Sequence, residues 1–476
     1  MAYSVAKEGD AMGYNFFGYN REQQYLLPPS LQEWVPKGDL AWFVLDAVKQ
    51  MDLSEYYKGY RTDGSGAAGF DPSVMVAILL YAYCVGERSS RKIERLCERD
   101  VAFRVVAANL TPDHSTISRF RKDHRKAIGK LFTEILRICG EAGLVKVGVV
   151  AIDGTKIEAN ASLAANRTHD SLRNEVEKIL DEAEAIDKAE DALYGEGKRG
   201  DELPEEMRNS ESRLKRLKEA KERLELEAAE VARQKLTEIA KREEEERESG
   251  KKKRGRKPKE PDKNPDAEAK ANVTDPESRI MKTRKGYVQG YNAQTAVAEG
   301  QIIISAEVTQ EENDVGQMHP MLGKAKEELK SAGIEDDIEH ALFDAGYCSE
   351  DNLSKLATGG PEVFVATAKD WKQQKAQKER GSPRGRIPKG LTERERMERK
   401  LMTKAGQEMY GKRKIIVEPP FGQMKDGQGF RRFMVRGMRS VSSEWRLMCA
   451  SHNLLKLWRS GMQRVCGKWQ TAAVMC

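Results

Sequence analysis

Two short apolar runs in this chain each end in an aspartate. Residues 147–152 lead to Asp153, and residues 341–343 lead to Asp344. Apolar runs of this length are typical of buried strands. Each aspartate alone could simply terminate its strand, since Asp is common at turns. Together they predict a core in which two acids from distant parts of the sequence lie at strand ends.

A third acid, Glu418, follows a basic cluster and the apolar residues 415–417. Lys425 stands seven positions later, which is about two helical turns. Pro419 and Pro420 suit the first turn of a helix. We therefore expect a helix that begins at these prolines and carries Glu418 and Lys425 on one face, although Glu418 could also be an ordinary surface acid.

Three carboxylates from separate segments match the needs of a two-metal phosphoryl-transfer site. Mg²⁺ prefers oxygen ligands and retains several waters, so few carboxylates are sufficient. Two such ions can activate an attacking oxygen and stabilise a leaving one.

Three blocks carry a resemblance to a known family. Residues 151–160 resemble the first-aspartate block of the DDE transposases of bacterial insertion sequences, and residues 343–349 with Asn352 resemble the second. Tyr410, Arg413, Glu418 and Lys425 resemble the Tyr-Arg-Glu-Lys signature of that family. The resemblance covers about residues 14–457 and is nearest to the insertion-sequence type "eleven-eighty-two". One departure is that four residues, rather than the usual three, separate Arg413 from Glu418, which makes Lys414 an alternative to Arg413.

The resemblance implies a transposase that cleaves DNA at the ends of its own insertion sequence and transfers the strands. It implies an RNase H-like core in which Asp153, Asp344 and Glu418 are catalytic and hold two Mg²⁺ ions, with Mn²⁺ as a substitute. Lys425 is expected to bind a DNA phosphate, and Tyr410 and Arg413 to position the DNA. Asn352 is expected to order the loop after Asp344. Lys156, Asn160 and Gln294 are further candidates for contact with DNA.

Composition limits the alternatives. The apolar fraction of 39% is enough for a sizeable core, and no apolar run is long enough to span a membrane. The first ten residues lack the apolar segment of a signal peptide. Seven scattered cysteines without a Cys-x-x-Cys pair favour reduced thiols and argue against a zinc site. We expect a cytoplasmic bacterial protein associated with the nucleoid.

Charge is unevenly distributed along the chain. The net charge of +6 includes 20 basic against 7 acidic residues over residues 371–440, whereas residues 171–250 have a net charge of −8. This asymmetry favours a nucleic-acid surface near Glu418, although a solvated basic face without a ligand is the alternative.

Residues 1–145 are expected to form a helical N-terminal domain. Predicted helices cover residues 73–85, 90–98 and 101–107, and a further helix begins near residue 116 with Asp113 or Ser115 as its N-cap. This last helix presents polar residues suited to a helix-turn-helix that binds DNA: Ser118, Arg119, Arg121 and Lys122. The alternative is a helical cap packed on the catalytic domain.

The remaining chain is expected to be mixed α+β. Residues 146–160 and 280–460 form the catalytic core, with strands near residues 147–152, 286–297, 301–308, 340–344 and 362–366. Residues 161–279 form a helical or coiled-coil insertion. It ends in a basic linker whose Arg254 and Arg256 are expected to contact DNA phosphates. Residues 461–476 are a C-terminal tail.

The predicted function is therefore that of a metal-dependent transposase. Its expected partners are the terminal inverted repeats of its element, target DNA and a second copy of the chain, in a dimer or a higher assembly, without a membrane. Two alternatives remain: a sequence-specific DNA-binding repressor with an inactive core, and an RNase H-like nuclease.

Overall fold

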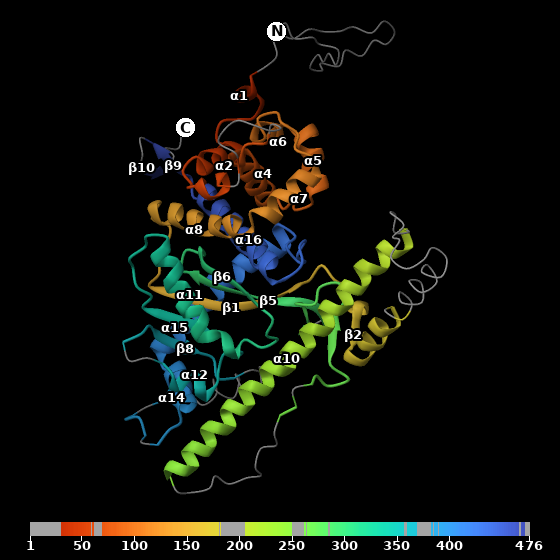
Figure 1. Cartoon of the computed structure of the whole chain (residues 1–476). Helices are drawn as coiled ribbons and strands as arrows, with labels where there is room; N and C mark the ends of the chain where they lie inside the picture. Colours follow the sequence, from red (N-terminus) through yellow and green to blue (C-terminus); the bar gives the residue numbers. More distant parts are fainter. Residues whose placement is uncertain are drawn as a thin grey trace, which may run out of the picture.

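The computed structural model describes residues 30–471, apart from residues 59, 61–68, 180, 182–204, 250–260, 263, 284–285, 357–358, 369–381, 384, 389 and 466–467. The predicted DNA contacts Arg254 and Arg256 lie outside the described residues. A mixed sheet forms the centre of the protein, and a group of helices from the N-terminal part gathers at one end (Figure 1).

The N-terminal part is helical, as expected. Its elements are α1 (Leu31–Trp34), α2 (Leu40–Val48), α3 (Ser54–Tyr57), α4 (Pro72–Cys84), α5 (Ser90–Arg99), α6 (Val101–Val106), α7 (His114–Asp123) and α8 (Arg125–Glu141). The α4 helix is apolar on every side and buried, which makes it the centre of this group. Asp71 caps it by accepting a hydrogen bond from Ser73 N at 2.7 Å, and Pro72 occupies the first turn.

The central sheet combines parallel and antiparallel strands. Its strands are β1 (Val149–Glu158), β4 (Arg279–Thr283), β5 (Gly286–Ala298), β6 (Ile303–Thr309), β7 (His340–Phe343) and β8 (Glu362–Val365). The strand order is β4-β5-β1-β7-β8, and β6 also pairs with β5. The strands β1, β7 and β8 run parallel, and β5 runs antiparallel to β1. The predicted strands and the β5–β6 hairpin are therefore confirmed.

The β1 strand extends beyond its prediction, to Glu158. The sequence from Gly154 to Lys156 is too polar to indicate a strand, yet β5 pairs with β1 along its whole second half, from Asp153 opposite Thr295 to Glu158 opposite Gly290. Tertiary pairing thus overrides the weak local propensity of this segment.

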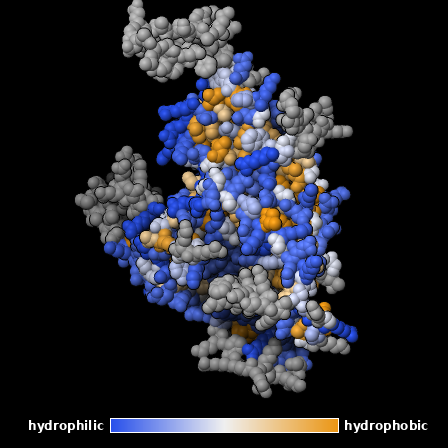
Figure 2. Space-filling view, turned by 180° about the vertical axis from the view of Figure 1, so that it is seen from behind, coloured by the Kyte–Doolittle hydropathy of each residue, from blue (hydrophilic) through white to orange (hydrophobic). Residues whose placement is uncertain are grey.

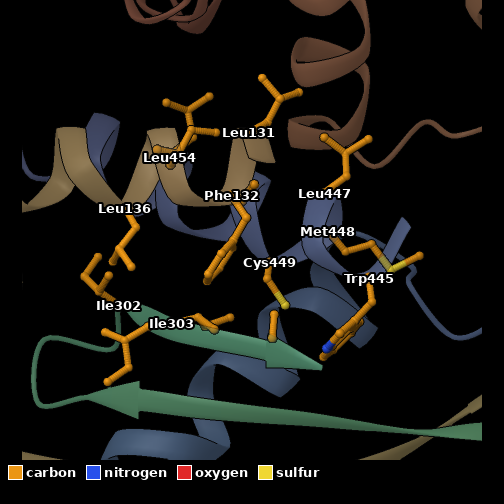
Figure 3. Packing of buried hydrophobic residues seen from close by; sticks show 14 of the residues in the cluster. Leu131, Phe132, Leu136, Ile302, Ile303, Trp445, Leu447, Met448, Cys449 and Leu454 are labelled. Carbon is orange, nitrogen blue, oxygen red and sulfur yellow. The ribbon is translucent and has the colours of Figure 1, made fainter. Parts of the chain in front are cut away.

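Helices flank the sheet and fill the C-terminal third. They are η2 (Val315–Gln317), α11 (Met318–Ser331), α12 (Glu350–Ser354), α14 (Glu393–Met402), α15 (Lys404–Gly422), the π-helical turn η3 (Gln423–Gly427) and α16 (Met438–Arg459). The helices α8 and α16 pack together over β6, as Figure 3 shows for Phe132, Trp445 and Ile303. One continuous apolar core therefore joins the N-terminal helices to the sheet.

The expected start of a helix at the prolines is wrong. The α15 helix begins after Thr403, whose hydroxyl accepts from Gly406 N at 3.0 Å, and Pro419 and Pro420 lie inside its last turn. A proline within a helix deprives the carbonyl four residues earlier of its donor. For Pro419 that carbonyl belongs to Ile415, which accepts instead from Gln301 Nε2 at 2.9 Å. A partner from outside the helix thus compensates for the missing N–H, and η3 follows directly.

The insertion forms a separate small core. Helical residues 169–179 pack against the first part of the long helix α10 (Glu205–Ser249) through Leu172, Val176, Leu217 and Leu224. Nearby are η1 (Leu163–Ala165) and the paired strands β2 (Asn166–Thr168) and β3 (Lys270–Asn272). Beyond this core α10 is mostly exposed (Figure 1), with Leu226 70% exposed. The described residues of the insertion thus show the first part of the predicted pair of helices, and the coiled coil stays a prediction.

The C-terminal segment forms a two-stranded hairpin, β9 (Met462–Val465) and β10 (Lys468–Thr471). The face seen in Figure 2 is mostly hydrophilic, with an apolar patch towards the N-terminal helices. Within the described part of the chain, no helix combines the length and apolar character that crossing a membrane requires. The described cysteines carry free thiols.

Candidate active site

The fold brings Asp153 and Asp344 together. Ile152 on β1 pairs with Phe343 on the parallel strand β7, so the next residue of each strand is an aspartate at the same sheet edge. Asp153 Oδ1 accepts from Gly154 N at 2.9 Å, and Asp344 Oδ1 accepts from Gly346 N at 2.8 Å. The two acids predicted from separate strand ends therefore form one constellation.

A buried arginine from α15 neutralises this pair. Arg413 Nη2 donates to Asp153 Oδ2 at 2.6 Å, and Arg413 is 9% exposed. Burial raises the pKa of Asp153 to about 7, Asp344 and Asp314 add to the rise, and Arg413 opposes it. Arg413, rather than the exposed Lys414, is thus the cation that faces the aspartates.

Two further members of the predicted signature lie at the same place. Lys425, on η3, donates through Nζ to the Thr155 hydroxyl and to the carbonyl of Lys156 at 3.3 Å. Burial and the nearby Arg431 lower the pKa of Lys425. Burial raises the pKa of Tyr410 to about 12, and the negative charges of Asp344 and Asp153 contribute. A cluster of two acids, two cations and a phenol results.

Glu418 is not joined to this cluster. It is exposed on α15, about two turns before Lys425. It stands five positions after Arg413, which corresponds to about 140° around the helix axis. Arg413 faces the aspartates, so Glu418 points towards the solvent side of α15. Its predicted role as the third catalytic acid stays a prediction.

Asp314 is a further acid beside the aspartates, close enough for its charge to raise the pKa of Asp153. Its Oδ1 accepts from Asn292 Nδ2 and from Gln294 Nε2, both at 2.7 Å. Gln294 Oε1 in turn accepts from the hydroxyl of the fully buried Tyr347. The side chain of Asp314 makes no cap hydrogen bond to η2. The sequence signal that could have pointed to Asp314 is the pair of amides Asn292 and Gln294 on β5, because buried amide groups need hydrogen-bond partners.

Two glycines permit this close packing. A Cβ at Gly154 would lie 2.1 Å from Gln294 Nε2 and 2.7 Å from Asp314 Oδ1. A Cβ at Gly346 would lie 2.9 Å from Asp344 Oδ1 and 3.3 Å from Asp314 Oδ2. A side chain at either position would therefore force these neighbouring side chains to shift. The glycines that follow the two aspartates in the sequence are therefore part of the site's architecture.

The other predicted residues have distinct environments. Asn352 donates to the carbonyls of Tyr347 and Val315 at 2.8 and 2.7 Å, which confirms that it orders the loop after Asp344. Gln294 is fully buried in the amide network, so the expectation that it contacts DNA is wrong. Asn160 Nδ2 donates to the carbonyl of Met434 at 2.9 Å, and Lys156 Nζ donates to the carbonyl of Glu312.

The α7 helix carries the residues predicted to bind DNA. Asp113 is its N-cap, accepting from Ser115 N at 2.9 Å and Thr116 N at 3.0 Å. Ile117 and Phe120 are buried. Ser118, Arg119 and Lys122 are exposed, whereas Arg121 is half-buried and donates to the carbonyl of Arg88 at 2.9 Å and to the Ser90 hydroxyl. Three of the four predicted side chains are therefore available to a ligand.

The carboxylates of Asp153 and Asp344 are the kind of oxygen ligand that a hard divalent cation prefers. Asp153 and Asp344 offer carboxylate oxygens at one sheet edge, and a guanidinium already lies against Asp153, where positive charge is favourable. Within the described residues, no group of three or more acidic, His or Cys side chains is arranged to enclose a metal ion. The aspartate pair can thus contribute ligands but does not form a closed protein cage.

Two family models match the chain. A transposase domain (DUF772) matches residues 29–123, which include α7, and a transposase DDE domain matches residues 372–458, which include α15 and η3. Neither range includes Asp153 or Asp344, whose proximity comes from the sheet. No curated protein and no solved structure matches the chain.

Proposed function

We propose that the chain acts as a DDE transposase of insertion sequences, as its two family-model matches support, and that it cleaves DNA at the ends of its own element and transfers the freed strands. The observation that carries the proposal is the meeting of Asp153 and Asp344 with Arg413 at one sheet edge. We further assign the chain to the insertion-sequence type "eleven-eighty-two", on its Tyr-Arg-Glu-Lys residues.

We propose that the sheet is an RNase H-like core. The order β6-β5-β1-β7-β8, in which β5 alone of these five strands runs antiparallel to the others, supports this assignment. Asp344 follows the carboxyl end of β7, and Asp153 lies on β1 where its parallel pairing with β7 ends; open sheets with parallel strands commonly bind ligands at such carboxyl ends.

Asp153 and Asp344 would hold divalent ions, Mg²⁺ or Mn²⁺, two in each site, with Glu418 as the predicted third carboxylate. When bound, such ions supply activation of the attacking oxygen and stabilisation of the leaving oxygen in an in-line displacement. Asp153 must be ionised to act as a ligand, and Arg413 favours that form against the effect of burial. Asp314 adds negative charge beside the pair without leaving its two amide partners.

The cations of the C-terminal helices would position DNA. Lys425 is anchored near β1 by Thr155 and leaves a compact positive charge close to the aspartates, which suits a backbone phosphate. Arg413 compensates the charge of Asp153 and thereby also keeps the carboxylate oriented. Tyr410 stays protonated over the physiological pH range because its pKa is raised, so its hydroxyl can donate a hydrogen bond to the DNA.

DNA recognition would reside in the N-terminal domain, with α7 reading the terminal repeats through Ser118, Arg119 and Lys122. The basic linker with Arg254 and Arg256 would add phosphate contacts. Pairing two element ends requires two active sites, so we propose at least a homodimer on the DNA. Because its substrate is chromosomal DNA, we propose action at the bacterial nucleoid.

The test is cleavage of the DNA that flanks the gene for this chain, in Mg²⁺, by the wild type and by Asp344→Ala. Asp351→Ala is the matched control, because Asp351 is an exposed acid on the neighbouring α12, ion-paired with Lys355 at 2.6 Å. We expect cleavage at the element's boundary by the wild type and by Asp351→Ala, and none by Asp344→Ala.

Two other outcomes would replace the proposal. Binding to the element ends without cleavage in Mg²⁺ or Mn²⁺ would favour a repressor with an inactive core. Equal cleavage of any duplex would favour a nuclease of the RNase H type.

A further inference from the structure

A basic groove separates α7 from the C-terminal part of the chain. It has a volume of about 710 Å³ and lies between α7, the beginning of α5 and the chain around residues 434–444. Its basic lining comes mainly from the two parts that match family models, namely Arg88, Arg91, Arg121, Lys122 and Arg436, and Arg125 follows just after the first of them. Serine hydroxyls, including Ser118 and Ser440, complete much of the remaining surface.

The acid that lines this groove is already satisfied. Glu444 is 4% exposed and accepts from Met434 N at 2.9 Å and from Val435 N at 3.2 Å. Tyr83 also donates its hydroxyl to Glu444, at 3.3 Å. Glu444 also pairs with Arg88 at 3.9 Å, but a carboxylate fixed in this way cannot turn outward to neutralise the other cations, so the groove presents a positive surface to a ligand.

The cations fall into two groups. Arg125 connects the two walls, because its Nη1 donates to the Ser440 hydroxyl at 3.1 Å and its Nε to the carbonyl of Lys122 at 2.8 Å. Arg91 and Lys122 are exposed, and neither has an ion-pair partner in the part of the chain that the structure describes. Arg125 therefore shapes the groove, whereas Arg91 and Lys122 are available to bind an anion.

A second hollow adjoins the groove at the end of β1. Arg436 also lines this hollow of about 620 Å³, together with Arg432, Asn160 and Glu158, the last residue of β1. Glu158 lies five residues along β1 from Asp153, which is about 17 Å in a strand. Each strand of a DNA duplex carries a phosphate for about every 3.4 Å of its axis. The distance along β1 between Glu158, at the second hollow, and Asp153 therefore corresponds to roughly five base pairs.

We propose that these two hollows form a continuous track for the DNA backbone, which leads the element-end duplex from α7 to the aspartate pair. The inference rests on the proposed function for its ligand and goes beyond it in assigning Arg91, Arg125 and Arg436. The track sets how many base pairs separate the recognised sequence from the cleaved bond. Arginine and serine donors suit phosphate oxygens, and backbone contacts fix register without reading sequence.

The test measures duplex binding by fluorescence anisotropy across a salt series, for an element-end duplex and a scrambled duplex of equal length. The variants are Arg91→Gln and Arg436→Gln. Arg99→Gln is the matched control, because Arg99 is exposed on the same helix as Arg91 and does not line the groove. Each groove variant is expected to weaken binding about fivefold and to lower the salt slope by about one, equally for both duplexes.

The comparison with α7 gives the second readout. Arg119→Gln is expected to weaken binding to the element end more than to the scrambled duplex, because base contacts carry specificity. If Arg91→Gln and Arg436→Gln keep the salt slope of Arg99→Gln, the track is refuted. Tighter binding of polyglutamate than of either duplex, lost in the same variants, would also refute it in favour of an acidic protein partner.

The two proposals fail in distinguishable ways. Wild-type cleavage at the element's boundary, combined with unchanged salt slopes in the groove variants, would refute the track alone. Absence of cleavage by the wild type would refute the proposed function, whereas the salt slopes on the scrambled duplex would still decide whether the groove binds a DNA backbone.

Discussion

The substitution Asp153→Asn is expected to stabilise the metal-free protein at neutral and alkaline pH. Burial raises the pKa of Asp153 from 3.8 to about 7, even with Arg413 opposing the rise. A tenfold change in the ionisation constant corresponds to about 1.4 kcal/mol, so ionised Asp153 lowers the free energy of unfolding by at most about 4 kcal/mol. The side chain is 19% exposed, and allowing for solvent at that surface we expect about 2–4 kcal/mol.

The pH dependence identifies the cause. The pKa of Asp153 is higher in the folded than in the unfolded state. The protonated side chain therefore contributes fully to the free energy of unfolding below pH 3.8, and this contribution is lost as the pH rises through about 7. The stability gained by Asp153→Asn should accordingly grow between pH 5 and pH 8. The opposing attraction between Arg413 and the ionised carboxylate is already contained in this pKa.

The assay is urea unfolding in EDTA at pH 5 and pH 8, for the wild type, Asp153→Asn and the exposed control Asp46→Asn. The quantity to compare is the difference in unfolding free energy between variant and wild type, because other buried acids cancel from it. Added Mg²⁺ should stabilise the wild type and not Asp153→Asn, by mass action on the folded state. A variant less stable than the wild type at pH 8, or a difference independent of pH, would refute the reasoning.

Three further predictions concern the surrounding structure. Gly154→Ala should cost about 1–3 kcal/mol and disturb the Gln294 amide, whereas Gly323→Ala, with nothing within 4 Å of the new Cβ, should be neutral or stabilising by thermal unfolding. Asn453→Ala should lower the free energy of unfolding, measured in urea, by about 2–5 kcal/mol. The Asn453 side chain accepts from the N–H of the buried Ile303 on β6 and donates to its carbonyl, both at 2.8 Å, and the substitution leaves both groups without a partner. Burial lowers the pKa of His452 from 6.5 to about 4, so stability should fall by up to about 3 kcal/mol as the pH drops through this interval. His452→Gln should remove this loss of stability at acidic pH. If the free energy of unfolding of His452→Gln falls with pH as steeply as that of the wild type, His452 is not its cause.

Local sequence patterns predicted much of the secondary structure. The apolar runs before Asp153 and Asp344 become neighbouring strands, and the N-cap of α7 is Asp113, because both signals depend on short-range chemistry. The register that makes the two aspartates neighbours is a property of the sheet, and it could be inferred beforehand only from the family resemblance.

The features that the sequence did not predict depend on long-range partners. Pro419 lies inside α15 since Gln301, more than a hundred residues earlier, satisfies the carbonyl that the proline leaves without a donor. Asp314 lies beside the aspartates since Asn292 and Gln294 hold it there. Its position before a helix is equally typical of a cap, so its local pattern could not distinguish the two roles.

The C-terminal helices contribute positive charge to the observed site. The charge of Asp344 and burial both disfavour the ionised form of Asp153. Arg413 on α15 and Lys425 on η3 bring compensating charges from a segment more than 60 residues beyond Asp344. The sheet alone would therefore hold Asp153 mainly in its protonated form near neutral pH. Docking of α15 onto β1 favours the ionised form that a metal ligand requires, so formation of a competent site depends on the folding of the last third of the chain onto the sheet.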